Sequence, residues 1–153
     1  MKYLVRSDAV LTDVAFLLVR VCVGAVFLAH GWDAVVNRGV AEMVPGHREL
    51  GIPLPELSAP FLAYGELVGG VLLIVGAVTR AAAVVLAFIM GGAWVFVHAE
   101  GGLMLANGGF EYVMVLAAIC LLVLVHGPGR FSADALAAGR FGAPLPERPA
   151  ARA

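Results

Sequence analysis

Four ionisable side chains stand within or beside apolar stretches of the sequence, and their types suit proton transfer. They are His30, Glu66, His98 and Glu111. Glu66 lies inside the segment AYGELVGGVLL, which otherwise reads as lipid-soluble. Because a charge at bilayer depth costs about 2.5–3.5 kcal/mol, we expect Glu66 to face the protein interior and to have a partner or hold a proton. A carboxyl or imidazole that exchanges a proton with a bound ligand acts as a general acid or base.

The composition identifies the environment in which these side chains are placed. Of the 153 residues, 61% are hydrophobic and only 14% are charged, unlike a soluble domain. The sequence therefore predicts an all-α membrane protein, since open sheet edges cannot be satisfied in lipid. Ten Lys and Arg against eleven Asp and Glu leave the net charge near zero. This balance gives no reason to expect nucleic acid, and the expected partner is the lipid bilayer.

Four apolar stretches predict a bundle of four transmembrane helices, because each approaches the roughly 20 residues that cross a hydrocarbon core. The stretches cover residues 14–36, 58–78, 81–98 and 111–126. We expect one transmembrane domain over residues 1–136 and a disordered cytoplasmic tail over residues 137–153. Two short helices outside the spans are also expected, one at the membrane surface within residues 37–57 and one starting at Ser132.

The distribution of basic residues predicts the orientation of the four spans. One side of the membrane would hold Lys2, Arg6, Arg80, Arg130, Arg140, Arg148 and Arg152, and the other side only Arg38 and Arg48. Because Lys and Arg gather on the cytoplasmic side, both termini are predicted to be cytoplasmic. The protein is thus expected to be a multi-pass protein of the bacterial plasma (inner) membrane.

Threading the spans in alternating directions sorts the polar residues into two levels. The outer level receives His30, Asp33, Glu66, His98 and Glu111, with Glu66 about two turns below the outer surface. The cytoplasmic level receives Arg20, Arg80, His126 and Arg130. Near the outer level Gly65 and Gly69 form a GxxxG pattern, which lets another helix approach closely, and we expect that helix to belong to the same bundle.

The outer cluster suits three kinds of site. Two imidazoles and two carboxylates suit a metal, but no ligand spacing supports one, and no metal is assigned. The cluster also suits a path for a small solute, or a proton-coupled pocket for a quinone-like redox molecule. In the pocket, Glu66 and His30 would exchange protons with the ligand. The aromatic rings of Tyr64, Trp94 and Phe110 would hold the ligand, and His98 and Glu111 would complete the site. Glu66 can instead serve only to join helices.

Several motifs together resemble the DoxX family of small four-helix bacterial membrane proteins. They are LLVRVCVGAVFLAHGWDAV, GIPLPELSAPFLAYGELVGGVLLIVGAVTRAAA, GGFEYVMVL and GPGRFSADAL, between Leu17 and Leu136. The matching positions are Arg20, His30, Gly31, Glu66, Arg80, Glu111, Gly127, Pro128, Gly129 and Asp134. One departure is Ala34, which stands where the family's HGxxK motif has lysine, so no role of that lysine is transferred.

The resemblance implies a subunit of a membrane redox system that handles a quinone or a thiol/sulfur electron donor, with other redox proteins as partners. It implies a quinone-linked oxidoreductase subunit, alone or in an oligomer, with quinone as the cofactor. Ligand-binding roles are expected for Arg20, Tyr64, Trp94, His98 and Glu111, and structural roles for Gly65, Gly69, Arg80, Gly127, Pro128 and Gly129. The rival function is a non-enzymatic scaffold or chaperone-like partner protein, because a fold by itself does not fix the chemistry.

Overall fold

The computed structural model describes residues 2–140, with side chains from residue 10 onward, and every regular element in this part is helical. The α-helices are α1 (Lys2–Trp32), α2 (Val40–Glu49), α3 (Pro55–Val75), α4 (Thr79–Ala93), α5 (Glu111–His126) and α6 (Ala133–Ala137). Two π-helical stretches, η1 (Asp33–Arg38) and η2 (Trp94–His98), extend α1 and α4. The all-α prediction is confirmed for the described residues, as are the two short helices α2 and α6. The predicted disordered tail falls mainly on residues 141–153, outside that part.

Three helical segments are long and apolar enough to cross a membrane: Val10–Arg38, Pro55–Val75 and Thr79–Gly101. They correspond to the first three predicted spans. The fourth predicted span coincides with α5, which has 16 residues. At 1.5 Å per residue it is about 24 Å long, somewhat less than the hydrocarbon thickness of about 30 Å.

The ends of α3 lie three residues before the predicted ones, for local reasons. Pro55 occupies the first turn, where a missing N–H costs nothing. At the other end, Gly76 adopts φ +73°, and the amides of Gly76 and Ala77 both donate to the carbonyl of Leu72. This left-handed glycine cap ends the helix before the apolar run ends.

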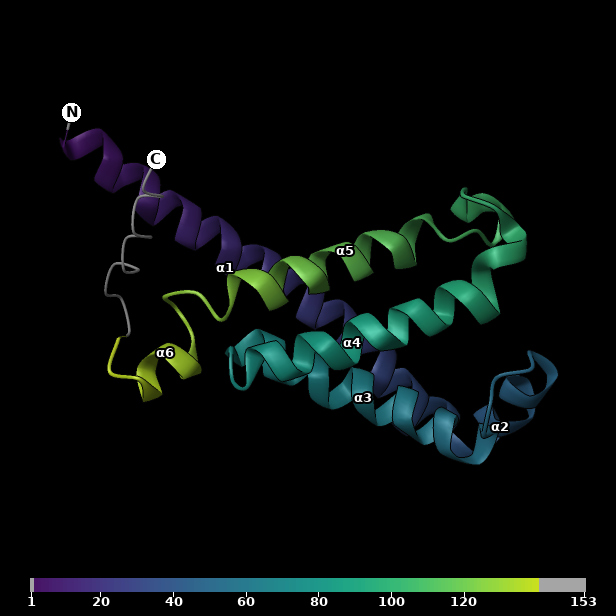
Figure 1. The fold of residues 1–153 in the computed structure, drawn as a ribbon. Coiled ribbons are helices and arrows are strands. Elements are labelled where there is room, and N and C mark those ends of the chain that lie inside the picture. Colours follow the sequence, from purple (N-terminus) through teal and green to yellow (C-terminus); the bar gives the residue numbers. More distant parts are fainter. Residues whose placement is uncertain (1, 141–153) are drawn as a thin grey trace, which may run out of the picture.

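The helices pack in the order α1, α3, α4, α5, and α1 meets α5 only over a short stretch. In Figure 1, α4 runs between α3 and α5, while α1 crosses behind them. The buried core lies between these four helices and includes Phe27, Leu73, Leu86, Leu116 and Val123. Large hydrophobic side chains also cover the outside of the bundle, as a helical membrane protein requires.

The closest approach of two helices is between α1 and α3, and glycines make it possible. A Cβ added to Gly31 would lie 2.2 Å from the backbone nitrogen of Leu67, and one added to Gly70 would lie 2.4 Å from that of Leu28. Gly65 and Gly69 instead face the side chains of Ile89 and Leu86 on α4. The GxxxG pattern therefore packs within the bundle, but the tightest contact belongs to other glycines.

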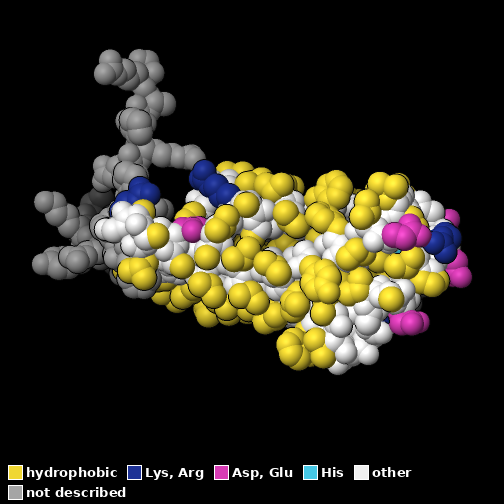
Figure 2. All heavy atoms as spheres, turned by 90° about the horizontal axis from the view of Figure 1, so that it is seen from below, with side chains coloured by type: hydrophobic (Ala, Val, Ile, Leu, Met, Phe, Trp, Pro, Cys, Tyr) yellow, Lys and Arg dark blue, Asp and Glu magenta, His cyan; other side chains and the backbone are white. Residues whose placement is uncertain are grey.

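The polar residues gather at the two ends of the bundle. Figure 1 shows α2 and the α4–α5 connection at one end, called the α2 end, and α6 with the α3–α4 turn at the other, called the α6 end. Figure 2 shows acidic and basic side chains at both ends of one face, with hydrophobic side chains between them.

Candidate functional site

Glu66 is a buried carboxyl in the middle of α3, with 7% of its surface exposed. It lies eleven residues from Pro55, so it is about 16 Å or three turns from the start of the helix. The sequence placed it two turns from Ser58, and α3 begins three residues before Ser58. Its neighbours Leu67 and Gly65 face α1 and α4 respectively. Glu66 therefore points into the bundle between those two helices.

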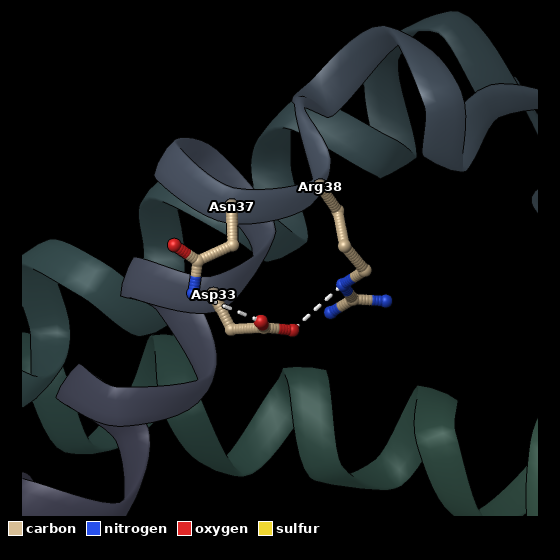
Figure 3. A network of polar contacts seen from close by, with 3 residues as sticks. All are labelled: Asp33, Asn37 and Arg38. Carbon is tan, nitrogen blue, oxygen red and sulfur yellow. Dashed lines mark hydrogen bonds and ion pairs between the residues drawn. The ribbon is translucent and has the colours of Figure 1, made fainter.

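No described residue forms a hydrogen bond or an ion pair with the Glu66 carboxyl. The charged group with which it interacts electrostatically is Arg38, at the end of η1. Arg38 is already engaged, because its Nε lies 2.7 Å from Oδ2 of Asp33. Asn37 donates a second hydrogen bond to Asp33, at 3.2 Å, and Figure 3 shows these three side chains together on one turn. Glu66 is thus near a partly neutralised cation and has no direct partner.

His30 and Tyr64 do not join Glu66, contrary to the prediction. His30 is exposed, because the buried stripe of α1 runs through Phe27, Gly31 and Ala34 and turns residue 30 outward. Tyr64 is 51% exposed, and two residues along a helix put it on nearly the opposite side of α3 from Glu66. Both side chains therefore face away from the bundle interior into which Glu66 points.

His98 and Glu111 are bound to the backbone of the connection between α4 and α5. Nδ1 of His98 lies 2.8 Å from the carbonyl of Gly108, and Leu105 donates its amide to Oε1 of Glu111 at 2.6 Å. Beside them the rings of Trp94 and Phe110 stack with their centroids 4.8 Å apart. These predicted ligand-binding side chains hold a loop in place. The described residues contain no group of three or more metal-ligating side chains.

Arg20 lies at the α6 end, where it joins α1 to the chain that follows α5. It is 1% exposed and donates hydrogen bonds to the carbonyls of Pro128 and Phe131, the latter at 2.7 Å. Its guanidinium also lies against Gly76, where an added Cβ would be 2.4 Å from one terminal nitrogen. Arg20 therefore joins α1 to the segment after α5 at the end of the bundle away from α2, and its ligand-binding role stays a prediction.

The predicted structural residues after α5 surround this arginine. Gly127 and Gly129 have φ values of +90° and +75°, which side chains other than glycine rarely adopt. Gly127 lies beside the guanidinium of Arg80, and Gly129 beside the ring of Phe16. These two glycines let the chain turn back so that the carbonyl of Pro128 reaches Arg20.

Asp134, which the family pattern includes, joins α6 to the start of α4. Its carboxylate accepts hydrogen bonds from the amides of Val78 and Thr79, at 2.8 and 3.0 Å, and from the Thr79 hydroxyl at 2.9 Å. Burial alone raises the pKa of this carboxyl, but those hydrogen bonds and the charge of Arg20 bring the pKa of Asp134 below its usual value. Asp134 thus caps the N-terminus of α4 as an anion.

Sequence reasoning missed a groove of about 630 Å³ at the α2 end. We call it the α2 groove. It lies between α2, α3, α4 and the loop 50–54, and its lining includes His47, Ser58, Phe61, Leu62, Phe88 and Gly92. His47 is 7% exposed, and its Nδ1 lies 3.0 Å from the hydroxyl of Ser58. Because His47 stands in a polar connection without apolar periodicity, the only sequence signal was a histidine followed by the apolar turn GIPLP.

These features define a helical membrane protein with a buried carboxyl in one span and an apolar groove at one end. The family model described as DoxX matches residues 15–99, more than half of the chain. The chain belongs to the DoxX family. The match includes Arg20, Glu66 and His98 but stops before Glu111, so the resemblance of residues 111–136 lies outside it.

Two curated proteins are similar to this chain. One, from Bacillus subtilis (strain 168), is named "Putative oxidoreductase CatD" and is 32% identical over 109 residues, which are 71% of this chain and 78% of that protein. The other, from Haemophilus influenzae (strain ATCC 51907 / DSM 11121 / KW20 / Rd), is named "Uncharacterized protein". It is 31% identical over 71 residues, 46% of this chain and 47% of that protein. No solved structure matches the chain.

Proposed function

We propose that this chain is a multi-pass protein of the bacterial inner membrane and a quinone-linked subunit of a redox system. In this proposal α1, α3, α4 and α5 are the four spans and both termini are cytoplasmic. The α2 end then faces the extracytoplasmic side. The substrate is a quinone or a thiol/sulfur electron donor, and other redox proteins are its partners.

The observation that carries this proposal is the buried carboxyl of Glu66 without a hydrogen-bond partner among the described residues. An unpaired charge at bilayer depth is costly, so this carboxyl needs either a proton or a nearby cation. Arg38 is the cation near enough to act on it. A carboxyl whose charge depends on one neighbour is suited to take up and release a proton during turnover.

Reduction of a quinone consumes protons, which such a group can deliver. Two thiols that close a disulfide release two electrons and two protons, and a quinone that accepts both becomes a quinol. Glu66 would carry protons between the ligand and the α2 end. The name of the Bacillus subtilis relative, an oxidoreductase, agrees with a redox role.

The rival function, a scaffold in which Glu66 only joins helices, finds less support. A carboxyl that joins helices does so by hydrogen bonds across the helix contact. No described residue donates such a bond to Glu66, and the helix contacts beside it are made by Gly31, Gly70 and Gly69. The packing at this point is therefore achieved without the carboxyl.

The test compares Glu66→Gln with Glu56→Gln, a matched change on the same helix at an exposed position. Protein purified from native membrane is assayed for co-extracted quinone, for thermal stability and for electron transfer from a thiol-oxidising partner to quinone. We expect Glu66→Gln to keep its melting temperature and to lose quinone-dependent electron transfer, while Glu56→Gln keeps both.

Two results would contradict the proposal. One is wild-type protein that neither retains nor binds a quinone or a sulfur donor. The other is a Glu66→Gln variant that unfolds in detergent while the wild type shows no redox activity, which would leave the scaffold function as the better one.

A further inference from the structure

The α2 groove is a separate feature from the Glu66 carboxyl, although both involve α3. Leu62 lines the groove and lies one helical turn before Glu66. Ile89 also lines the groove, is 4% exposed, and packs over Gly65. Leu62 and Ile89 thus form a floor between the groove and the bundle interior. A molecule in the groove would be separated from the bundle interior by these two side chains and would not displace the core.

The groove opens on the lipid-facing surface of two spans. Phe61 on α3 and Phe88 on α4 are 46% and 70% exposed, and their rings meet edge to face with centroids 5.9 Å apart. Both rings line the groove. Since these residues belong to spans, a lipid-soluble molecule can reach the groove from the side, without passing through water. Its volume, about 630 Å³, is in the range of sites for small organic ligands.

One polar side chain, His47, is nearly completely buried within this apolar lining. Its Nδ1 is paired with Ser58 at 3.0 Å, and no described residue forms a hydrogen bond with its Nε2. Burial lowers the pKa of His47 below the ordinary 6.5, so the ring is neutral at neutral pH. If Nδ1 accepts the Ser58 hydroxyl proton, Nε2 carries the ring hydrogen and is a donor.

We propose that the α2 groove binds the ring of a lipid-soluble quinone and that His47 donates a hydrogen bond from Nε2 to a ring carbonyl. The identity of the ligand as a quinone rests on the proposed function; its place in the groove rests on the geometry. A phospholipid acyl chain would fill the same apolar lining but offers His47 no acceptor. A ring with carbonyl oxygens uses both the aromatic walls and the imidazole.

The first test fills the groove with a side chain. Gly92 lines it, and a Cβ added there meets nothing within 4 Å, so Gly92→Leu occupies the groove without disturbing the helix packing. Gly91→Leu is the matched control, because an added Cβ there also meets nothing within 4 Å and Gly91 does not line the groove. Binding of a decyl-substituted benzoquinone to the full chain in phosphatidylcholine nanodiscs is followed by quenching of tryptophan fluorescence.

We expect Gly92→Leu to weaken quinone binding by about tenfold or more, because the leucine side chain occupies the space that the quinone ring needs. Gly91→Leu should leave quinone binding unchanged. His47→Leu removes the donor and should weaken binding by about three- to tenfold, the usual effect of one neutral hydrogen bond. The hydrogen bond has its own control: decylbenzene, which lacks the carbonyl oxygens, should bind wild type and His47→Leu equally.

The outcomes separate this inference from the proposed function. Normal quinone affinity in Gly92→Leu would overturn the groove as the quinone site and leave it to lipid, even if Glu66 is needed for turnover. Loss of binding in Gly92→Leu together with normal electron transfer in Glu66→Gln would support the groove and contradict the role of Glu66. Absence of saturable quinone binding to wild type would overturn both.

Discussion

At the α6 end, Arg20 and Asp13 are buried and bound to groups over a hundred positions away in the sequence. Asp13 accepts a hydrogen bond from Arg130 at 2.7 Å, and both side chains are largely shielded. At the α2 end, the ion pair between Arg48 and Glu56 has both side chains about two-thirds exposed. The buried polar groups nearer that end, Glu66 and His47, keep atoms that no described residue bonds.

This contrast indicates that the α6 end stabilises the fold and that the α2 end serves binding and turnover. The buried Arg20 is bonded through both terminal nitrogens, and among the described residues only its Nε has no partner. Removing such a side chain leaves its partners unsatisfied in a low dielectric, so it fixes the structure. A buried carboxyl to which no described residue bonds is the exception in native proteins and is suited to a ligand or a proton. We therefore expect substitutions at the α6 end to affect stability and substitutions at the α2 end to affect binding and turnover.

The largest expected effect on stability is that of Arg20→Ala. The change leaves the carbonyls of Pro128 and Phe131 without their buried donor and should cost about 3–5 kcal/mol of unfolding free energy. Arg20→Lys keeps the charge but cannot reach both carbonyls, so its free energy of unfolding should lie between those of wild type and Arg20→Ala. Reversible unfolding in mixed detergent micelles is measured for wild type, the two Arg20 variants and Arg48→Ala. If Arg20→Ala is no less stable than Arg48→Ala, the contrast between the two ends fails.

Gly31→Ala comes next, because it tests the contact that holds α1 against α3. The added Cβ would lie 2.2 Å from the Leu67 nitrogen, so the helices must separate, at a cost of about 1–3 kcal/mol. Gly91→Ala is the control; its Cβ meets nothing within 4 Å, and the better helix propensity of alanine should leave stability equal or slightly higher. Equal melting temperatures for the two variants would contradict this packing.

Removing the cap supplied by Asp134 should have a moderate and pH-dependent effect. Asp134→Ala leaves the amides of Val78 and Thr79 without an acceptor and should cost about 1–2 kcal/mol. The pKa of Asp134 is lower in the folded protein than its ordinary value of 3.8, so the unfolded chain binds this proton more tightly. The stabilisation is therefore present above that value and is lost as the pH falls through the folded pKa.

The measurement compares melting temperatures of wild type and Asp134→Asn between neutral pH and about pH 3, a range that includes the unfolded carboxyl pKa. The wild type should lose more stability on acidification than the variant. Parallel pH profiles would show that Asp134 is not the titrating group.

The smallest expected effect is at the exposed ion pair of the α2 end. Arg48 and Glu56 are both solvent-exposed, and such pairs contribute little because water and salt screen them. Glu56→Gln should leave the melting temperature, quinone binding and electron transfer unchanged within measurement error. A clear loss of stability would mean that the α2 end also depends on its ion pairs.

Sequence by itself determined the environment and the elements of this protein. Apolar runs of helical length predicted helices near their observed positions, and the short helices α2 and α6 followed from breaks and caps in the connections. The sorting of polar residues toward two ends followed from alternating directions of the spans. These properties depend on local composition and on the length of each run, which a single sequence contains.

Tertiary structure alone decided which polar groups have partners. His30 turned outward because the stripe that packs on α3 runs through Gly31, and Arg20 met carbonyls of a segment more than a hundred residues later. The α2 groove formed where α2 packs against α3, and α4 supplies a further wall, which placed His47 within an apolar lining. Such contacts depend on where helices cross and how closely glycines let them approach, and no local pattern encodes that geometry.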